Sequence, residues 1–307
     1  MLDGLLIEQV RADEQLAGML ATFKKNPAFL YQKSPSATAK GWKGDTNYPR
    51  ADYTVDMRSD PERKKAGTLT INIWCSTQSA AMPEDIEARI VEIINGTFYT
   101  ANGSDTVCAV WSGSEAFDFE GKGEGISREP EIFGVTVLFD LLAFPVQITT
   151  DPDPTEGLIA FTKRNFPAVT VISADKTAPI FKPTDEHPAI YWRFIGSTTA
   201  AQNFSVSWFN GAFAAHIIAS TIAERNRWIK AITETMQAAG EVILPDGSPM
   251  FINRLEIRHD SDPLREGQLA VTGQYGVLTA KAKLPAQIPL NNAHFQQKTE
   301  VKFNGKT

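Results

Sequence analysis

The sequence is short of the residues that most often carry out chemistry. Its 307 residues include only two cysteines and four histidines. The histidines are scattered, and none has the HExxH, HxH or Cys-His spacing by which a metal site is recognised. They are His187, His216, His259 and His294. The sequence therefore predicts no metal site.

Motifs of the common enzyme classes are also missing. There is no GxSxG nucleophile elbow, no GxxxxGK[ST] phosphate loop and no GxGxxG after a strand, and the glycines of Gly121–Gly125 have the wrong intervals. His259 beside Asp260 and Asp262 has the residue types of a general base, but these residues are more typical of a loop cap. We therefore expect no catalytic residue and no cofactor, and a protein that is not an enzyme.

Long apolar runs are absent as well. No run reaches the about 18 residues that a membrane span needs. The start, Met1-Leu2-Asp3, lacks the basic and then apolar segments of a secretory signal. We expect a soluble protein made in the cytoplasm. Cys75 and Cys108 lie in predicted strands and are interpreted as buried thiols in a reducing compartment, in preference to a disulfide or a ligand pair.

The charge is negative and unevenly distributed. The net charge is −6, which argues against general affinity for nucleic-acid backbones, because that affinity depends on cations that neutralise phosphates. Residues 1–150 hold 14 basic and 21 acidic side chains, a net charge of −7, whereas residues 151–307 hold 16 and 15, a net charge of +1. A surface of this kind facing DNA would let the DNA slide past.

The most informative positive feature is an apparent internal repeat of residues 48–142 in residues 187–278. Each copy has two strand-like runs with alternating apolar and polar residues, then a helix, then two further strands. The first helix is predicted to begin at Met82-Pro83, and the second to span 217–240 and stop at Gly240. The last strands align without a gap, Arg128 onward with Arg265 onward. A chance match of two α+β segments is the alternative.

These patterns predict an α+β fold of two tandem copies of a small mixed or antiparallel sheet packed with helices. A helix from Leu5 to Lys24 is expected to dock on the first sheet. Helix-like stretches ending in a proline are expected to precede both copies, and four tryptophans are expected in the cores. The stretches are Ala21–Phe29 and Ala160–Val169, and the tryptophans are Trp74, Trp192, Trp208 and Trp228.

Two segments are predicted to lie outside the repeated units. The predicted first domain is 1–148 and the predicted second domain is 158–284. Between them lies a linker, 149–157, whose two Asp-Pro steps favour extended backbone. After them comes a C-terminal arm, 285–307, which either orders on a partner or frays.

One segment carries a resemblance to a known family. Residues 48–99 contain a proline-led first strand, a charged hairpin, a strand ending in an aromatic residue, and a helix that starts with proline and acids. In that order these elements resemble the central part of the tail-terminator, or tail-completion, proteins of long-tailed bacteriophages. The likeness covers about 95 residues well and, through the repeat, about 90 more weakly, and it rests on ordinary elements in order.

The resemblance implies a virion structural protein of the tail or neck, assembled in the host cytoplasm. It implies a homohexameric ring that caps the tail tube and presents a docking surface to head-completion and neck proteins, while DNA passes through without specific binding and no membrane is involved. The family unit usually occurs once. A doubled unit would suit a contractile tail, where the sheath protein is a further partner.

Two charged segments are the candidate sites under this hypothesis. The hairpin tip with Arg58, Arg63, Lys64 and Lys65 is either a solvated loop or a ring contact. The acidic loop with Glu115, Asp118, Glu120 and Glu124 is either a surface hairpin or a lining of the lumen that repels phosphates. Calcium binding by this loop is unfavoured, because Lys122 stands where a ligand is needed.

Alternative functions stay open at this point. Another neck or tail-end component, such as a head-tail connector or a sheath-associated protein, has the same sequence features. A different class is a soluble binding or hydrolytic protein of a mobile element. A ring-shaped oligomer distinguishes the structural protein from a solitary monomer with a pocket.

Overall fold

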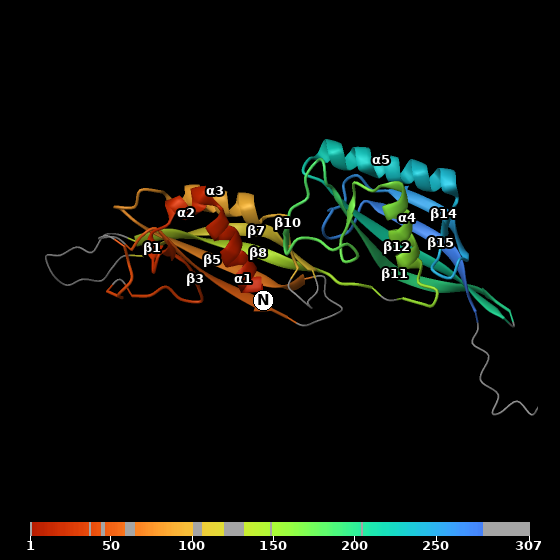
Figure 1. Ribbon diagram of the computed structural model, residues 1–307, viewed down its shortest axis with the longest axis horizontal. Coiled ribbons are helices and arrows are strands. Elements are labelled where there is room, and N and C mark those ends of the chain that lie inside the picture. Colours follow the sequence, from red (N-terminus) through yellow and green to blue (C-terminus); the bar gives the residue numbers. More distant parts are fainter. Residues whose placement is uncertain are drawn as a thin grey trace, which may run out of the picture.

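The chain forms two units that lie side by side along the long axis of the molecule, seen here in a computed structural model (Figure 1). Each unit is built on one large curved sheet with helices on one face, an α+β architecture as the sequence predicts. The structure describes residues 2–36, 38–43, 47–58, 65–100, 106–119, 132–147, 149–203 and 205–278. Within this part of the chain, no helix has both the length and the apolar character that a membrane span needs.

The first unit is built on a sheet with the strand order β10-β6-β7-β8-β5-β4-β3. All of its pairings are antiparallel except β3 with β4. Its elements are α1 (Leu2–Ala12), α2 (Glu14–Met19), β1 (Thr22–Phe23), β2 (Asn26–Pro27), β3 (Phe29–Tyr31), β4 (Arg50–Met57), β5 (Lys65–Ser76), α3 (Pro83–Ile94), β6 (Thr97–Thr100), β7 (Thr106–Phe119) and β8 (Ile132–Phe144).

The second unit has the strand order β13-β14-β15-β12-β11-β9, and only β9 with β11 is parallel. Its elements are α4 (Pro154–Asn165), β9 (Thr170–Val171), β11 (Ala189–Gln202), β12 (Val206–Ile218), α5 (Ile222–Ala239), β13 (Glu241–Ile243), β14 (Pro249–Ile257) and β15 (Leu269–Leu278). Strand β10 (Ile180–Phe181) comes from this half of the chain but joins the sheet of the first unit.

The two sheets have the same connectivity. Apart from β10, the orders β6-β7-β8-β5-β4-β3 and β13-β14-β15-β12-β11-β9 correspond strand for strand along the chain. The single parallel pair lies at the same edge in both, and α3 and α5 each follow the second long strand of their unit. Mixed, mainly antiparallel sheets were expected from the alternating patterns, and this expectation is confirmed.

The gapless alignment of the last strands does not match their faces and is out of register by an odd number of residues. On β8 the side chains that face the helices include Val135 and Val137, whereas on β15 they include Leu269 and Val271. Pairing Arg128 with Arg265 would match Val135 with Thr272, which lies on the opposite face. Because side chains alternate along a strand, a slip of one residue exchanges the two faces.

The N-terminal region differs from the prediction. The expected helix 5–24 is two helices that meet at Asp13, whose carboxylate caps α2 by accepting from Leu16 N at 2.8 Å. The segment expected to be helical at 21–29 contains the short antiparallel pair of β1 and β2. Lys24 and Lys25 both have positive φ, 48° and 70°, as a tight primed hairpin turn requires.

The junction between the units also differs from the extended linker expected at 149–157. Helix α4 begins at Pro154, and the Asp153 carboxylate caps it by accepting from Thr155 N and Glu156 N. Asp-Pro is therefore the start of a helix here, because proline at the first helical position loses no hydrogen bond. Helix α5 begins at Ile222, later than expected, because residues 217 and 218 still belong to β12.

Several other predictions about helices are confirmed. Helix α3 starts at Pro83 and buries Ile86, Ile90 and Ile94, one stripe at a spacing of four residues. Helix α5 ends at Gly240, which has the left-handed conformation of a helix stop. The N-terminal helices do dock on the first sheet, since Leu6 of α1 belongs to its core.

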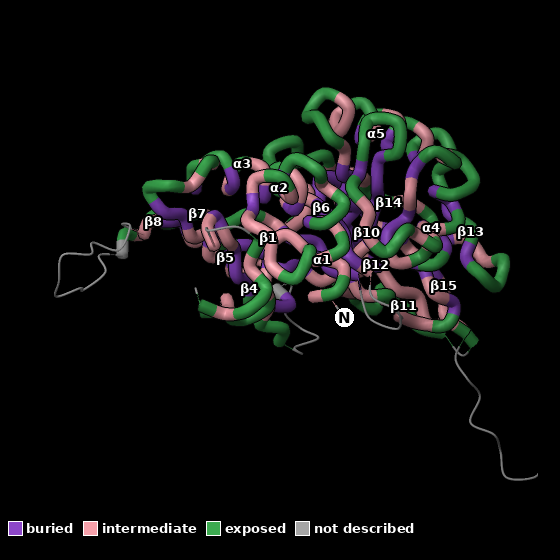
Figure 2. The backbone as a smooth tube through the Cα atoms, turned by 60° about the vertical axis from the view of Figure 1, so that its left-hand side comes forward, coloured by how far each residue is buried: buried purple, intermediate pink, exposed green. Residues whose placement is uncertain are grey.

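Each unit has its own core between the sheet and its helices, visible as buried segments along the central strands (Figure 2). Full burial of an aliphatic side chain there contributes about 1.5–3 kcal/mol. Of the four tryptophans expected in the cores, Trp192 is fully buried, whereas Trp74, Trp208 and Trp228 are half-buried. Trp74 lies on the face away from the helices, where it packs edge-on against Phe117.

A third apolar cluster joins the two units. Phe98 and Phe144 of the first unit pack with Tyr191 and Ile218 of the second. The Tyr191 hydroxyl donates to Pro145 O at 2.9 Å, and Arg265 pairs with Asp140 at 2.8 Å. Strand β10 extends the first sheet from the second half of the chain, so the units share backbone hydrogen bonds as well as side-chain contacts.

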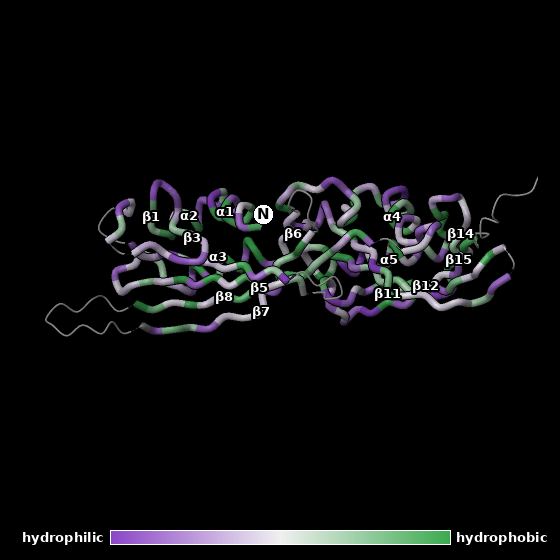
Figure 3. Tube along the Cα trace, turned by 90° about the horizontal axis from the view of Figure 1, so that it is seen from below, coloured by the Kyte–Doolittle hydropathy of each residue, from purple (hydrophilic) through white to green (hydrophobic). Residues whose placement is uncertain are grey.

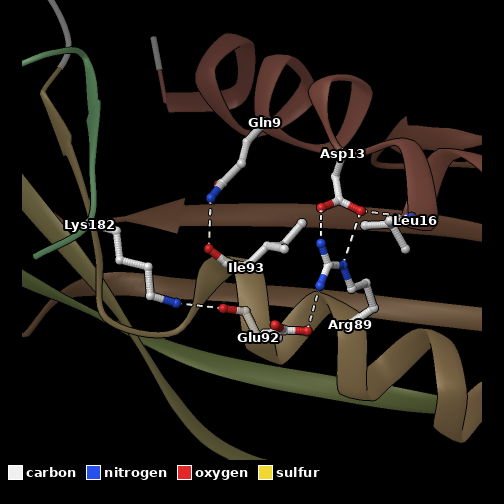
Figure 4. Close-up of polar contacts among 7 residues, drawn as sticks. All are labelled: Gln9, Asp13, Leu16, Arg89, Glu92, Ile93 and Lys182. Carbon is white, nitrogen blue, oxygen red and sulfur yellow. Dashed lines mark hydrogen bonds and ion pairs between the residues drawn. The ribbon is translucent and has the colours of Figure 1, made fainter. Parts of the chain in front are cut away.

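Polar contacts of α3 strengthen both the first unit and this joint (Figure 4). Arg89 of α3 forms ion pairs with Asp13 and with Glu92, and Gln9 donates to Ile93 O at 2.7 Å. Lys182, just after β10, donates to Glu92 O at the end of α3. Thus α3 is tied to the N-terminal helices on one side and to the second half of the chain on the other.

Candidate functional site

The second sheet carries a hollow of about 430 Å³ on its open face, the face opposite the helices. Neighbouring strands β12 and β15 supply its floor with small side chains. These are Ala212, Ala214, Ala270 and Thr272. The alternate residues Phe213 and Val271 belong to the core on the other side, as the alternation along a strand requires. The small floor residues leave the hollow open, and we call it the arginine groove after its walls.

The walls of the arginine groove come from the strands that flank the floor. The sheet register places Arg193 of β11 opposite Ala214, then Ala270, then Glu256 of β14 in one row across four strands. Arg254 and Arg258 lie two residues on either side of Glu256 and share its face. Cations therefore stand on both sides of an uncharged floor.

On the β14 side, one carboxylate lies between two guanidinium groups. Arg254 and Arg258 pair with Glu256 at 3.0 and 2.8 Å. The hydrogen bond from Arg258 holds the pKa of Glu256 below its ordinary value. Glu256 thus stays ionised and neutralises only one of the two arginines. Exposed ion pairs of this kind add little to the stability of the fold. The two arginines around one carboxylate are therefore suited to bind a further anionic group.

Arg193, on the other wall, is under-bonded. Its terminal nitrogens reach Arg265 O and Glu266 O only at 3.4 Å, and its Nε–H is buried without a partner among the described residues. Burial lowers the pKa of Arg193, although an arginine keeps its charge at any ordinary pH. A half-buried guanidinium with unfilled donors is well suited to a carboxylate, which accepts two hydrogen bonds at once.

The groove has the chemistry of a binding surface. Three arginines stand against Glu256 and the exposed Glu266, so its lining carries a surplus of one positive charge. The lining contains no cysteine, serine, lysine or histidine, and Glu256 is held as an ion-paired carboxylate. These groups can hold an anionic partner but provide no activated nucleophile.

The charged hairpin predicted as an interface lies between β4 and β5, which pair antiparallel. Arg58 is exposed and pairs with Asp56 at 3.4 Å, and its backbone N–H donates to Ala66 O. Arg63 and Lys64 lie outside the described residues, as does the side chain of Lys65. The role of this hairpin in a ring stays a prediction.

The acidic segment expected as a loop is a strand up to Phe119. Glu115 and Asp118 are exposed residues of β7, whereas Glu120 and Glu124 lie outside the described residues. Glu115 pairs opposite Thr136 on the face away from the helices, and Asp118 points to the other face, three positions along the strand. The loop prediction is wrong here because β8 offers a pairing partner over this whole length.

The other residues considered from sequence have structural surroundings. Asp262 accepts from Leu264 N at 2.8 Å and Arg265 N at 3.0 Å, which is the loop cap expected of this segment. Cys75 and Cys108 are free, buried thiols as expected, and burial raises the pKa of Cys75 to about 12. Among the described residues, no three His, Cys, Asp or Glu side chains gather as a metal ion would require.

Sequence reasoning missed the arginine groove. A signal existed on β14, where Arg254, Glu256 and Arg258 alternate with apolar residues and so share one face. The contribution of Arg193 has no such signal, because its place in the groove depends on which strands are neighbours. Scanned against known protein families and compared with curated proteins, the chain matches none of them.

Proposed function

We propose that this protein is a virion structural protein of the tail-terminator type, which assembles with copies of itself into a ring that caps a tail tube. Six copies around a tube, with one surface toward the tube and another toward the neck or head-completion proteins, form the arrangement we infer. A sheath protein is a further partner if the tail is contractile. DNA passes through the ring without specific binding.

The observation that carries the proposal is the matching strand order of the two units. We infer that they are tandem copies of one unit, and the first copy contains the segment that resembles tail terminators. A protein that repeats a whole unit, with no enzyme motif in either copy, fits assembly better than catalysis. Two related units in one chain also offer two related surfaces, as a capping protein that meets different partners needs.

The joint between the units supports an assembly role. Phe144 of the first unit packs edge-on against Tyr191 of the second at 5.1 Å between ring centroids, and β10 crosses into the first sheet. Contacts of this kind fix the angle between the units. A ring closes only when every subunit holds the same angle to the next, because the rotation between copies must add up to a full turn.

Long hairpin strands and the charge distribution add to this support. In the first unit β4 pairs antiparallel with β5 and β7 with β8 over most of their lengths, and the sequence between β4 and β5 is rich in charge. The net charge of −7 over residues 1–150 would repel DNA phosphates wherever this half faces the lumen. This combination suits a ring around a conduit.

A second candidate function follows from the arginine groove. A soluble protein that binds an acidic peptide or small anion would need such a surface and no ring. The two functions differ in their oligomeric state. The binding protein predicts a monomer at all concentrations, whereas the terminator predicts a ring, either alone or when tail tubes are present.

Electron microscopy of the purified full chain, alone and mixed with tail tubes, tests the proposal. We expect rings with a central opening, or a monomer that forms a ring at the end of each tube and stops tube growth. Tube length distributions measured with and without the protein provide the second readout. Tubes that keep growing, together with a monomer in every image, would overturn the proposal.

A further inference from the structure

We propose that the arginine groove receives the exposed strand β7 of a second copy of this chain. The contact is heterologous, with the second unit of one copy against the first unit of the next. The inference rests on the proposed function, because it supplies the contact by which copies join, but it is tested separately below.

Strand β7 is only partly covered within its own unit. Strand β6 pairs with residues 106–109 of it, and Asn95 Oδ1 accepts from Trp111 N at 3.0 Å. Beyond this point, β8 is the one strand that pairs with β7 among the described residues. On this stretch Trp111 is 45% exposed, and Ser114, Ala116 and Asp118 are exposed as well. An exposed tryptophan amid small residues is typical of an interface anchor.

Trp111, Ser114, Ala116 and Asp118 share one face of β7. Trp111 pairs opposite Phe139, and Ala116 opposite Val135, and both partners belong to the core under the helices. The Trp111 indole N–H donates to the Ser114 hydroxyl at 3.1 Å, which keeps its ring along the strand. This face of β7 therefore presents one aromatic ring, small residues and a carboxylate in a row.

The arginine groove complements that row in shape and charge. Its alanine floor gives an aromatic ring an apolar surface, and its volume of about 430 Å³ is large enough for an indole. Arg193 has unfilled donors, and Arg254 and Arg258 are 72% and 57% exposed. The Asp118 carboxylate, which makes no hydrogen bond or ion pair with the described residues, matches these donors.

The net charges of the two halves agree with this pairing. Residues 1–150 carry −7 and residues 151–307 carry +1, so contact between first and second units is favoured over contact between two first units. Strand β7 runs through the first unit and β11 and β12 through the second, on opposite sides of the joint in the view of Figure 3. Contact of the second unit of one copy with the first unit of the next repeats in one direction until the ring closes.

Two variants of the full chain, each with one of the two contact surfaces disrupted, test the contact, and we call them the blocked variants. The groove variant carries Arg254→Glu and Arg258→Glu, and the strand variant carries Trp111→Ala and Asp118→Arg. We expect either one to weaken self-association about tenfold or more in sedimentation velocity. The matched controls are Glu115→Arg, on the other face of the same strand, and Lys176→Glu with Lys230→Glu, which are exposed in the second unit outside the groove. The controls should associate like the wild type.

Mixing the two blocked variants provides the decisive readout. Each has one intact surface, so the mixture should form dimers and stop there. A cysteine pair, Ser114→Cys on one copy and Thr272→Cys on another, should crosslink between copies, and the native thiols are too buried to compete. Thermal melts of all variants distinguish lost contact from lost folding, and Thr272→Trp fills the groove without changing its charge.

The outcomes separate this contact from the proposed function. The proposed contact is overturned if the groove variant and the Thr272→Trp variant both associate like the wild type, even if rings still cap tubes. A wild-type chain that shows no self-association, with or without tubes, and no crosslink overturns it too. If the chains associate head to tail and crosslink but have no effect on tail tubes, the proposed contact is supported and the terminator function is overturned.

Discussion

Single residues decide several local features of this molecule. Asp13 is an example, since its carboxylate both caps α2 and pairs with Arg89 of α3. The hydrogen bonds from Arg89 hold the pKa of Asp13 below its ordinary value. The same side chain thus starts α2 and ties it to α3.

Removing the charge of Asp13 should change how stability depends on pH. A lowered folded-state pKa means that the stabilisation by Asp13 is present above the unfolded pKa of about 4 and is lost as the pH falls through the folded value. Asp13→Asn keeps a capping side chain but removes the ion pair. We expect a lower melting temperature than the wild type at pH 7 and a smaller difference near pH 2.

Calorimetric melts of both proteins between pH 2 and pH 8 measure this. Glu14→Gln, the neighbouring acid in the first turn of α2, serves as the control for general loss of negative charge. Melting temperatures of wild type and Asp13→Asn that run parallel over the whole range would contradict the assignment.

Gly134 is a second residue whose role depends on its neighbours. A Cβ added there would lie 2.0 Å from Ile73 O and 2.5 Å from the ring of Phe117. Gly134→Ala should therefore cost about 3 kcal/mol by overpacking. Gly18→Ala in α2 meets nothing within 4 Å and should stabilise by about 0.5–1 kcal/mol through helix propensity. Denaturant titrations compare the two, and equal effects would contradict this account of the strand packing.

At the scale of elements, the ends of the helices were the features that the sequence predicted best. Proline with following acids predicted α3, and glycine predicted the end of α5, because both depend on local backbone chemistry. The same local reasoning gave the wrong start for α4. An Asp-Pro step can extend a chain or start a helix, and burial of Leu158 and Phe161 in the second core selects the helix.

The capping of α4 gives a test at this scale. Asp153 accepts from Thr155 N and from the Thr149 hydroxyl, both at 2.8 Å. Asp153→Ala should destabilise the protein by about 1–2 kcal/mol. Thr221→Ala at the start of α5 loses a single bond of 3.2 Å and should cost less, about 0.5–1 kcal/mol. Equilibrium unfolding of both variants checks the order, which would be contradicted if the Thr221 change cost more.

At the scale of the whole molecule, the joint between the units determines whether they behave as one body. Phe144 lies at its centre and contacts Phe98 of its own unit as well as Tyr191 and His216 of the other unit. Such a joint couples the unfolding of the two halves, because opening it exposes aromatic surface on both sides.

Truncating the Phe144 side chain at the centre of the joint should uncouple the unfolding of the two units. We expect Phe144→Ala to cost about 3–5 kcal/mol and to split one calorimetric transition into two, because each unit keeps its own core. Phe161→Ala, within the second core, should lower stability without such a split. A single transition in the Phe144 variant, at a uniformly lower temperature, would show that the halves do not unfold separately.

The candidate sites show where sequence information ends at this scale. The charges of the β4–β5 hairpin are evident from the sequence, and so is the acidity around Glu115. The pattern could not tell that Glu115 and Asp118 point to opposite faces, because that depends on β7 remaining a strand through this region. The pattern also could not predict that Arg193 lies near the arginines of β14, which are some 60 positions further along the chain.

The sequence by itself determined what depends on neighbours along the chain: the α+β class, most strand and helix segments, the buried cysteines, and the absence of the GxSxG, GxxxxGK[ST] and GxGxxG motifs. Only the tertiary structure decided which strands adjoin, which face each side chain takes, how β10 crosses between units, and that three arginines surround one alanine floor. The physical reason is that periodicity records local burial, whereas a groove or a joint is produced by contacts between distant segments, whose pairing is selected by the packing of the whole core.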